Sequence, residues 1–196
     1  KKMEVVILVM QEKAKTKYRT IQLALQTGAV ISAALHGILI WQAIRYALPR
    51  PISYTNIMVV SLGILVCYGI IIVIHELGHA LAGKLVKFRF IFMILGPLKI
   101  QSGKKGLRFS LNRNRNLPQG LTGFLPVGTN DLIWRLGVYL AGGSAANIVL
   151  AILAFLSSWL FIHQNIWEKL GWVLGSGALS VALASLWPSN STSGYR

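Results

Sequence analysis

The sequence predicts an all-α polytopic membrane protein with about four transmembrane helices and a small membrane-associated β-hairpin or sheet. Two observations predict this fold class. Only 13% of the 196 residues are charged and 54% are hydrophobic, whereas a soluble domain has about 25% charged residues. Four apolar stretches are also long enough to cross about 30 Å of hydrocarbon at about 1.5 Å per residue. We therefore expect one domain in the cell membrane, with the lipid bilayer as its surroundings.

The predicted spans and segments follow from these apolar stretches. The spans run roughly over Ile21–Ile44, Asn56–Leu81, Ile133–Ile162 and Leu170–Trp187. The third is longer than a span requires, which indicates a tilt or an extension into water. The fourth is short and rich in glycine. The expected organisation is an N-terminal segment 1–20, a transmembrane core 21–188 and a C-terminal segment 189–196.

The chain is strongly basic, with 20 Lys+Arg against 5 Asp+Glu and a formal net charge of +15. Such a charge is typical of proteins that bind nucleic acid, but the apolar spans argue against a nucleic-acid partner. The basic residues gather in segment 1–20 and in connection 84–132, while the opposite loops hold only Arg45, Arg50 and Lys169. By the positive-inside rule we expect both termini and connection 84–132 to face the cytoplasm.

Connection 84–132 is the irregular part of the chain. Residues 88–101 are largely apolar and are interrupted by Gly96-Pro97. Leu107–Leu111 alternates with period two, which is typical of a strand. We therefore expect a small hairpin or sheet against the membrane surface. The rest is rich in glycine and proline, which predicts a loop, at Pro118, Gly120, Gly123, Pro126 and Gly128.

The motif with the clearest chemistry is His75-Glu76-Leu77-Gly78-His79, at the end of the uncharged run Ile57–Ile74. On a helix, two imidazoles one turn apart lie on one face with a carboxylate beside them, which suits two zinc ligands and a general base. A cluster that only reaches toward the polar interface is the alternative. Ionisable groups in a span cost about 2.5–3.5 kcal/mol each at its centre, which favours a functional site. We expect His75 and His79 to bind Zn²⁺ and Glu76 to be catalytic.

Together with two further motifs, this one makes the chain resemble the site-2 protease family of intramembrane zinc proteases. Gly96-Pro97 is similar to the membrane-associated β-hairpin of that family, and Gly142–Asn147 is similar to its Gly-Pro-x-x-Asn helix, with Ser144 in place of Pro. The resemblance covers roughly residues 57–188 and leaves the first span as an extra helix. It implies a zinc-dependent endopeptidase that cleaves membrane-spanning or membrane-associated proteins or peptides.

Asn147 is a polar residue in the middle of an apolar span. One interpretation is a hydrogen bond between helices, which is worth about 0.6–2 kcal/mol in membranes. The other, which the resemblance implies, is a group near the zinc that orients the substrate backbone. The sequence leaves both open.

The third zinc ligand is where the resemblance fails. A catalytic zinc needs three protein ligands, and the family takes the third from an Asp-Gly after Asn-x-x-Pro. Here Ser185-Leu186-Trp187-Pro188 stands at that place, and no Asp follows in segment 189–196. We expect this segment to be truncated ahead of the ligand, the alternative being that the ligand is lost.

Asp131 is the substitute within the chain, but its place before a span favours a helix cap paired with Arg135. Glu168 is expected on the far side of the membrane.

Loss of the third ligand would favour a different function, a non-catalytic membrane scaffold or a transporter that inherited the fold. A transporter is expected to show repeated halves or paired broken helices, and the sequence has no visible internal repeat. For the protease, we expect the hairpin within 88–111 to hold an extended substrate by β-strand addition.

Overall fold

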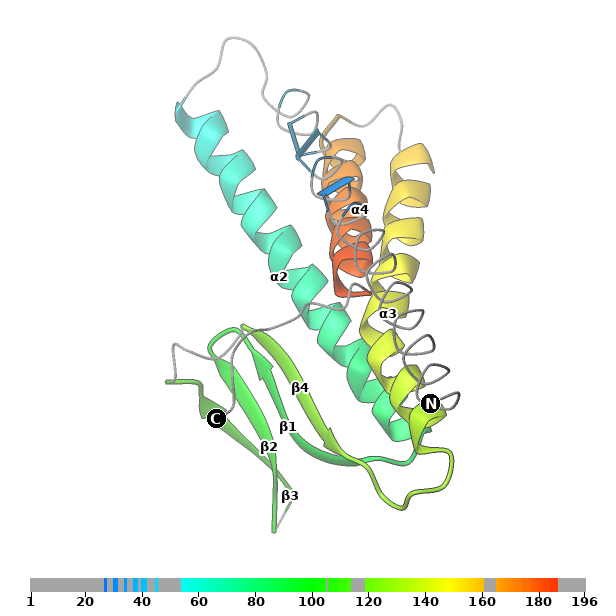
Figure 1. Ribbon diagram of the computed structural model, residues 1–196. Helices are drawn as coiled ribbons and strands as arrows, with labels where there is room; N and C mark the ends of the chain where they lie inside the picture. Colours follow the sequence, from blue (N-terminus) through cyan, green and yellow to red (C-terminus); the bar gives the residue numbers. More distant parts are fainter. Residues whose placement is uncertain are drawn as a thin grey trace, which may run out of the picture.

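The computed structural model describes residues 54–104, 106–113, 119–160 and 165–186, together with isolated positions between 27 and 45. The described residues form three helices and one sheet (Figure 1). The helices are α2 (Tyr54–Leu85), α3 (Leu132–Leu160) and α4 (Asn165–Ser185). The strands are β1 (Arg89–Leu95), β2 (Leu98–Gly103), β3 (Gly106–Leu111) and β4 (Gly120–Leu125).

The predicted fold class is wrong. The described part of the chain is a mixed α/β structure, with a four-stranded antiparallel sheet beside the helices. Within it, only Ile57–Leu85 and Leu132–Leu160 are long and apolar enough to cross a membrane. The expected fourth span is helix α4, which does not pass that test. The expected first span, Ile21–Ile44, lies largely outside the described residues, as do segments 1–20 and 189–196.

Helix α2 contains the His-Glu-x-x-His motif and ends in a well-defined cap. The amide of Phe88 donates to the carbonyl of Gly83 at 2.9 Å, and the amide of Lys87 donates to the carbonyl of Lys84 at 3.0 Å. This pair of bonds is the Schellman pattern, whose turn residue adopts a left-handed backbone. Lys87 fills that position with φ 58°. The cap turns the chain from the end of α2 directly into strand β1.

Helices α2 and α3 cross in close contact at two glycines. A Cβ on Gly142 would lie 2.5 Å from the Cβ of Ala82 and 2.6 Å from the carbonyl oxygen of Gly78. A Cβ on Gly78 would in turn meet the Gly142 carbonyl and the Cβ of Ala146. Small residues let the two backbones touch, as they do in membrane helix pairs. The contact brings the His75–His79 turn of α2 against α3.

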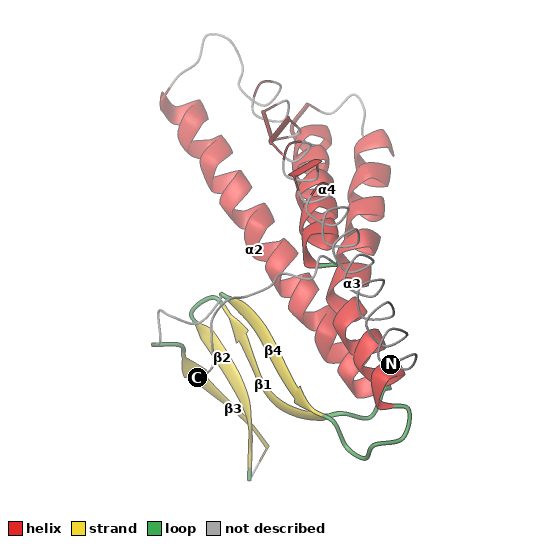
Figure 2. Ribbon diagram, viewed as in Figure 1, coloured by secondary structure: helices red, strands yellow, loops and turns green. Residues whose placement is uncertain are grey.

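The sheet has the strand order β3-β2-β1-β4, so β3 and β4 are its edges. Figure 2 shows the sheet beside the C-terminal part of α2, and β1 and β4 contact that helix. Met93 of β1 pairs with Thr122 of β4, and Leu95 pairs with Gly120. The strand predicted within 107–111 is confirmed as β3.

Strand β4 replaces part of the loop that was predicted after residue 117. At two glycines of β4, a side chain from a neighbouring element occupies the space that a Cβ atom would need. A Cβ on Gly120 would be 2.7 Å from Oε1 of Glu76, and one on Gly123 would be 2.7 Å from the Phe92 ring. Glycine in a strand interior marks close approach of this kind, so the pattern that predicted a loop belongs to a tightly packed strand.

Candidate metal centre

The two histidines of the motif face each other across one turn of α2. The Nε2 atoms of His75 and His79 are 3.1 Å apart, and the ring planes meet at 84° with centroids 4.7 Å apart. Two nitrogen ligands at about 2.05 Å from a tetrahedral zinc are about 3.3 Å apart. The observed separation is therefore close to that of a zinc-binding pair.

A backbone carbonyl fixes the tautomer of His79. Its Nδ1 lies 2.9 Å from the carbonyl oxygen of Tyr139 on α3. A carbonyl oxygen only accepts, so Nδ1 carries the hydrogen and Nε2 of the neutral ring has a free lone pair. A histidine that donates its other nitrogen to a carbonyl is the usual arrangement at metal sites. The lone pair of Nε2 points at His75.

Asn147 contacts the Nδ1 atom of His75. Its side chain is fully buried, and its Nδ2 lies 3.1 Å from Nδ1 of His75. In this orientation the buried Oδ1 has no hydrogen-bond partner, which is costly. The O and N atoms of an amide are assigned from the hydrogen-bond network alone. If the Asn147 amide is rotated by 180°, Oδ1 accepts a hydrogen bond from His75 Nδ1–H. Both Nε2 lone pairs then face the same point, where a cation could bind. In the other orientation of the amide, Nε2–H of His75 donates to Nε2 of His79.

Gly143 of α3 packs directly against the histidine pair. A Cβ at this position would lie 2.7 Å from Nε2 of His75 and would also clash with Nε2 of His79. The lone-pair atoms of both rings thus face a backbone with no side chain. The donor set and the separation of the two Nε2 atoms fit a zinc ion held by His75 and His79.

The carboxylate of Glu76 contacts strand β4 of the sheet. Its side chain is 5% exposed, and the hydroxyl of Thr122 on β4 donates to Oε2 at 2.5 Å. Its other oxygen, Oε1, faces Gly120. The glutamate is therefore beside the two ligands but is held by a different element, which suits a base better than a ligand.

The structure does not bring the alternative ligands to the pair. Within the described part of the chain, no group of three His, Cys, Asp or Glu side chains is close enough to hold a metal. Asp131 is exposed at the start of α3, with φ 51°, and its carbonyl accepts the first helical bond from Arg135. It lies about 12 Å along the helix from Tyr139, at about 1.5 Å per residue. The carbonyl of Glu168 accepts from Ser158, at the end of α3 away from the sheet.

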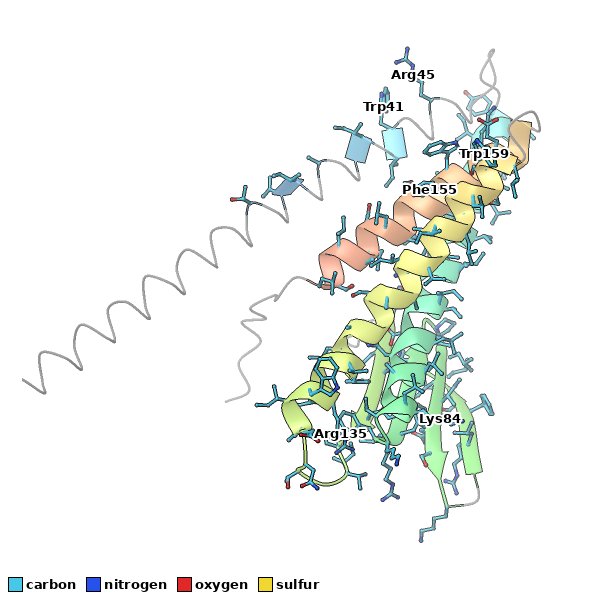
Figure 3. The ribbon with its side chains drawn as sticks, turned by 90° about the vertical axis from the view of Figure 1, so that its right-hand side faces the viewer. Trp41, Arg45, Lys84, Arg135, Phe155 and Trp159 are labelled. Atoms are coloured by element: carbon cyan, nitrogen blue, oxygen red, sulfur yellow. The ribbon has the colours of Figure 1, made fainter. Side chains whose placement is uncertain are left out.

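The predicted pairing of Asp131 with Arg135 is replaced by other contacts. Arg135 donates from Nε and Nη2 to the carbonyl of Val86 at 3.0 and 2.9 Å, and from Nη1 to Val127 and Asn130. Figure 3 shows Arg135 at the sheet end of α3. The guanidinium therefore joins the end of α2 to the loop before α3 and fixes the crossing that positions the histidines.

The end of α4 also reaches the level of the histidine pair. Ser144, next to Gly143, makes a hydrogen bond of 2.7 Å with Ser185. These are the two positions where the family resemblance expects Pro and Asn. Their contact places the last turn of α4 beside the turn of α3 that faces His75 and His79.

Thr122, Tyr139 and Gly143 are the site residues that sequence reasoning missed. Thr122 and Tyr139 had no signal, because each contacts the motif from about 46 to 60 residues away. Gly143 lies in the stretch Gly142–Asn147, which the sequence indicated only as part of the family resemblance. The chain itself matches no family model, and neither a curated protein nor a solved structure matches it.

Proposed function

We propose that this chain is an intramembrane zinc-dependent endopeptidase that cleaves membrane-spanning or membrane-associated peptides. One observation supports this proposal above the others, namely the two Nε2 atoms that face each other at 3.1 Å with their Nδ1 atoms engaged by Tyr139 and Asn147. This arrangement suits His75 and His79 as metal ligands. Both residues lie in a helix that is apolar enough to cross a membrane.

In peptide hydrolysis, each residue of the site would have a separate role. His75 and His79 hold the zinc through neutral imidazoles. Zinc, when bound, polarises the scissile carbonyl and raises the acidity of water. Glu76 takes a proton from the attacking water and passes it to the leaving amine. Asn147 orients His75, and the resemblance to site-2 proteases adds a role in orienting the substrate.

An extended substrate would lie near β4 rather than at the free edge of the 88–111 hairpin. Thr122 and Gly120 of β4 touch Glu76. Strand β3, the free edge of the hairpin, is three strands away from β4, which is about 14 Å at about 4.8 Å per strand. That distance is too large for a peptide paired with β3 to reach Glu76.

The proposed orientation places the sheet on the cytoplasmic side of the membrane. The two candidate spans are 29 residues each, about 43 Å at about 1.5 Å per residue. Both have their sheet-side ends next to the basic connection 84–132. Figure 3 shows Lys84 and Arg135 at this end and Trp159 at the other. Interfacial tryptophan and cytoplasmic Lys and Arg are typical of spanning helices.

The alternative is a non-catalytic membrane scaffold or transporter. It is favoured by the lack of a third His, Cys, Asp or Glu beside the pair in the described residues. The enzyme needs a third ligand, and the described residues do not bring one to the pair. A scaffold has no need for it.

Zinc analysis and proteolysis of a model substrate distinguish the two functions. The purified full-length protein should contain about one zinc ion per chain, and the His75→Ala/His79→Ala double variant should contain none. His163→Ala, which removes a histidine outside the motif, is the matched control. Cleavage of a fluorogenic peptide with one apolar span of about 20 residues should follow the zinc content. Zinc that persists in the double variant would refute the metal centre, and zinc without cleavage would favour the scaffold.

A further inference from the structure

The carboxylate of Glu76 is held by one side chain of the sheet. Thr122 is buried on β4, with 7% of its surface exposed. Its Oγ1 donates to Oε2 of Glu76 at 2.5 Å and also lies 3.4 Å from the Glu76 carbonyl oxygen. Hydrogen bonds to a charged acceptor are the short, strong ones. The bond thus fixes which carboxylate oxygen is engaged and leaves Oε1 as the oxygen that faces Gly120.

Thr122 is itself held by a residue that contacts the histidine pair. The hydroxyl of Tyr139 donates to the carbonyl of Thr122, and the carbonyl of Tyr139 accepts from His79. Thr122 also lies opposite Met93 of β1 in the ladder. These contacts fix the position of strand β4 relative to α2. The hydroxyl of Thr122 therefore holds the Glu76 carboxylate in a fixed position.

We propose that Thr122 is the positioning residue of Glu76, and that its hydroxyl holds Oε2 so that Oε1 stays beside Gly120 of β4. This inference rests on the proposed function. It adds that the base is oriented by β4 and the zinc ligands by α3. Valine has the shape of threonine without the hydroxyl, and serine keeps the hydroxyl. These two variants therefore separate the hydrogen bond from the packing of the strand.

The first test is spectroscopic and needs neither zinc nor a substrate. The chain has one aspartate and four glutamates, so ¹³C-glutamate labelling leaves few carboxylate bands in the infrared. The difference between wild type and Glu76→Gln identifies the band of Glu76. Thr122→Val should shift this band, while Thr122→Ser should leave it in place. Ser110→Ala removes a hydroxyl from β3 of the same sheet and should have no effect.

The second test is kinetic, with the single-span fluorogenic peptide as the probe. Thr122→Val should keep its zinc content and lower kcat about 10- to 100-fold, the usual effect of removing a group that orients an active-site residue. KM should change much less. In a Glu76→Gln background, Thr122→Val should cause no further loss, because the residue acts through Glu76.

The outcomes separate this inference from the function on which it rests. An unshifted band with unchanged kcat in Thr122→Val would overturn the role of Thr122 and leave the peptidase intact. A serine variant that behaves like the valine variant would also overturn it, because packing would then be the cause. If wild type cleaves nothing, the proposed function fails, and the infrared band alone decides whether Thr122 holds Glu76.

Discussion

Gly143→Ala is the sharpest test of the metal centre. The added methyl group would lie 2.7 Å from Nε2 of His75, whereas an ordinary contact is 3.4 Å or longer. The ring must therefore retreat by at least 0.7 Å (3.4 − 2.7), and His79 must also yield. Metal sites tolerate about ±0.2 Å in ligand distance. A displacement several times larger should remove at least one good zinc bond.

We expect Gly143→Ala to weaken zinc binding by about 10²-fold or more, which is about 2.7 kcal/mol at about 1.4 kcal/mol per factor of ten. Competition against a chromophoric chelator in detergent measures this affinity. Gly137→Ala is the matched control, since the same change in α3 meets only open space. Both variants gain the helix propensity of alanine, up to about 1 kcal/mol, so unfolding should not explain the difference. Wild-type zinc affinity in Gly143→Ala would refute the proposed geometry.

Three further predictions follow from the site, the orientation and the helix crossing. Glu76→Gln should keep zinc and fold but lose about 10²–10⁴-fold in turnover; unchanged proteolysis would exclude its role as base, and lost zinc would make it a ligand. In a Cys67→Ser background, cysteines at exposed Ser102 and Thr55 should react with an impermeant thiol reagent from opposite sides of the membrane. Reaction of both from one side would refute the orientation. Arg135→Ala should lower the free energy of unfolding by about 2–3 kcal/mol, because a charged donor loses several carbonyl partners; an unchanged thermal midpoint would contradict this.

The sequence alone was sufficient for the parts of the fold that depend on local pattern. The uncharged run before His75 predicted α2, and the one-turn spacing of the two histidines predicted a facing pair. The structure brings Asn147 to His75, which the sequence left open between a helix contact and a role at the site. The first two features follow from the period of a single helix, whereas the Asn147 contact joins α2 and α3.

The parts that failed depend on contacts between distant segments. Gly120 and Gly123 indicated a loop because the side chains that fill their space belong to α2 and β1. Thr122 resembles any strand threonine until the sheet is packed on α2. Helix α4 was predicted as a span, although its small residues are buried against α3 and α2 and its apolar surface is limited. Such contacts have no signature within a single window of sequence.

The crossing at Gly78 and Gly142 restricts how this chain can evolve. A Cβ atom on either glycine would collide with the backbone of the other. A larger residue therefore fits at neither position while the two helices stay in place. Gly78 also lies inside the His-Glu-x-x-His motif, between Glu76 and His79. The variable positions of that motif are therefore not equivalent. In relatives with this architecture, positions 78 and 142 are expected to stay small together or to change together. An otherwise intact motif with a large residue at position 78 would indicate a different partner helix.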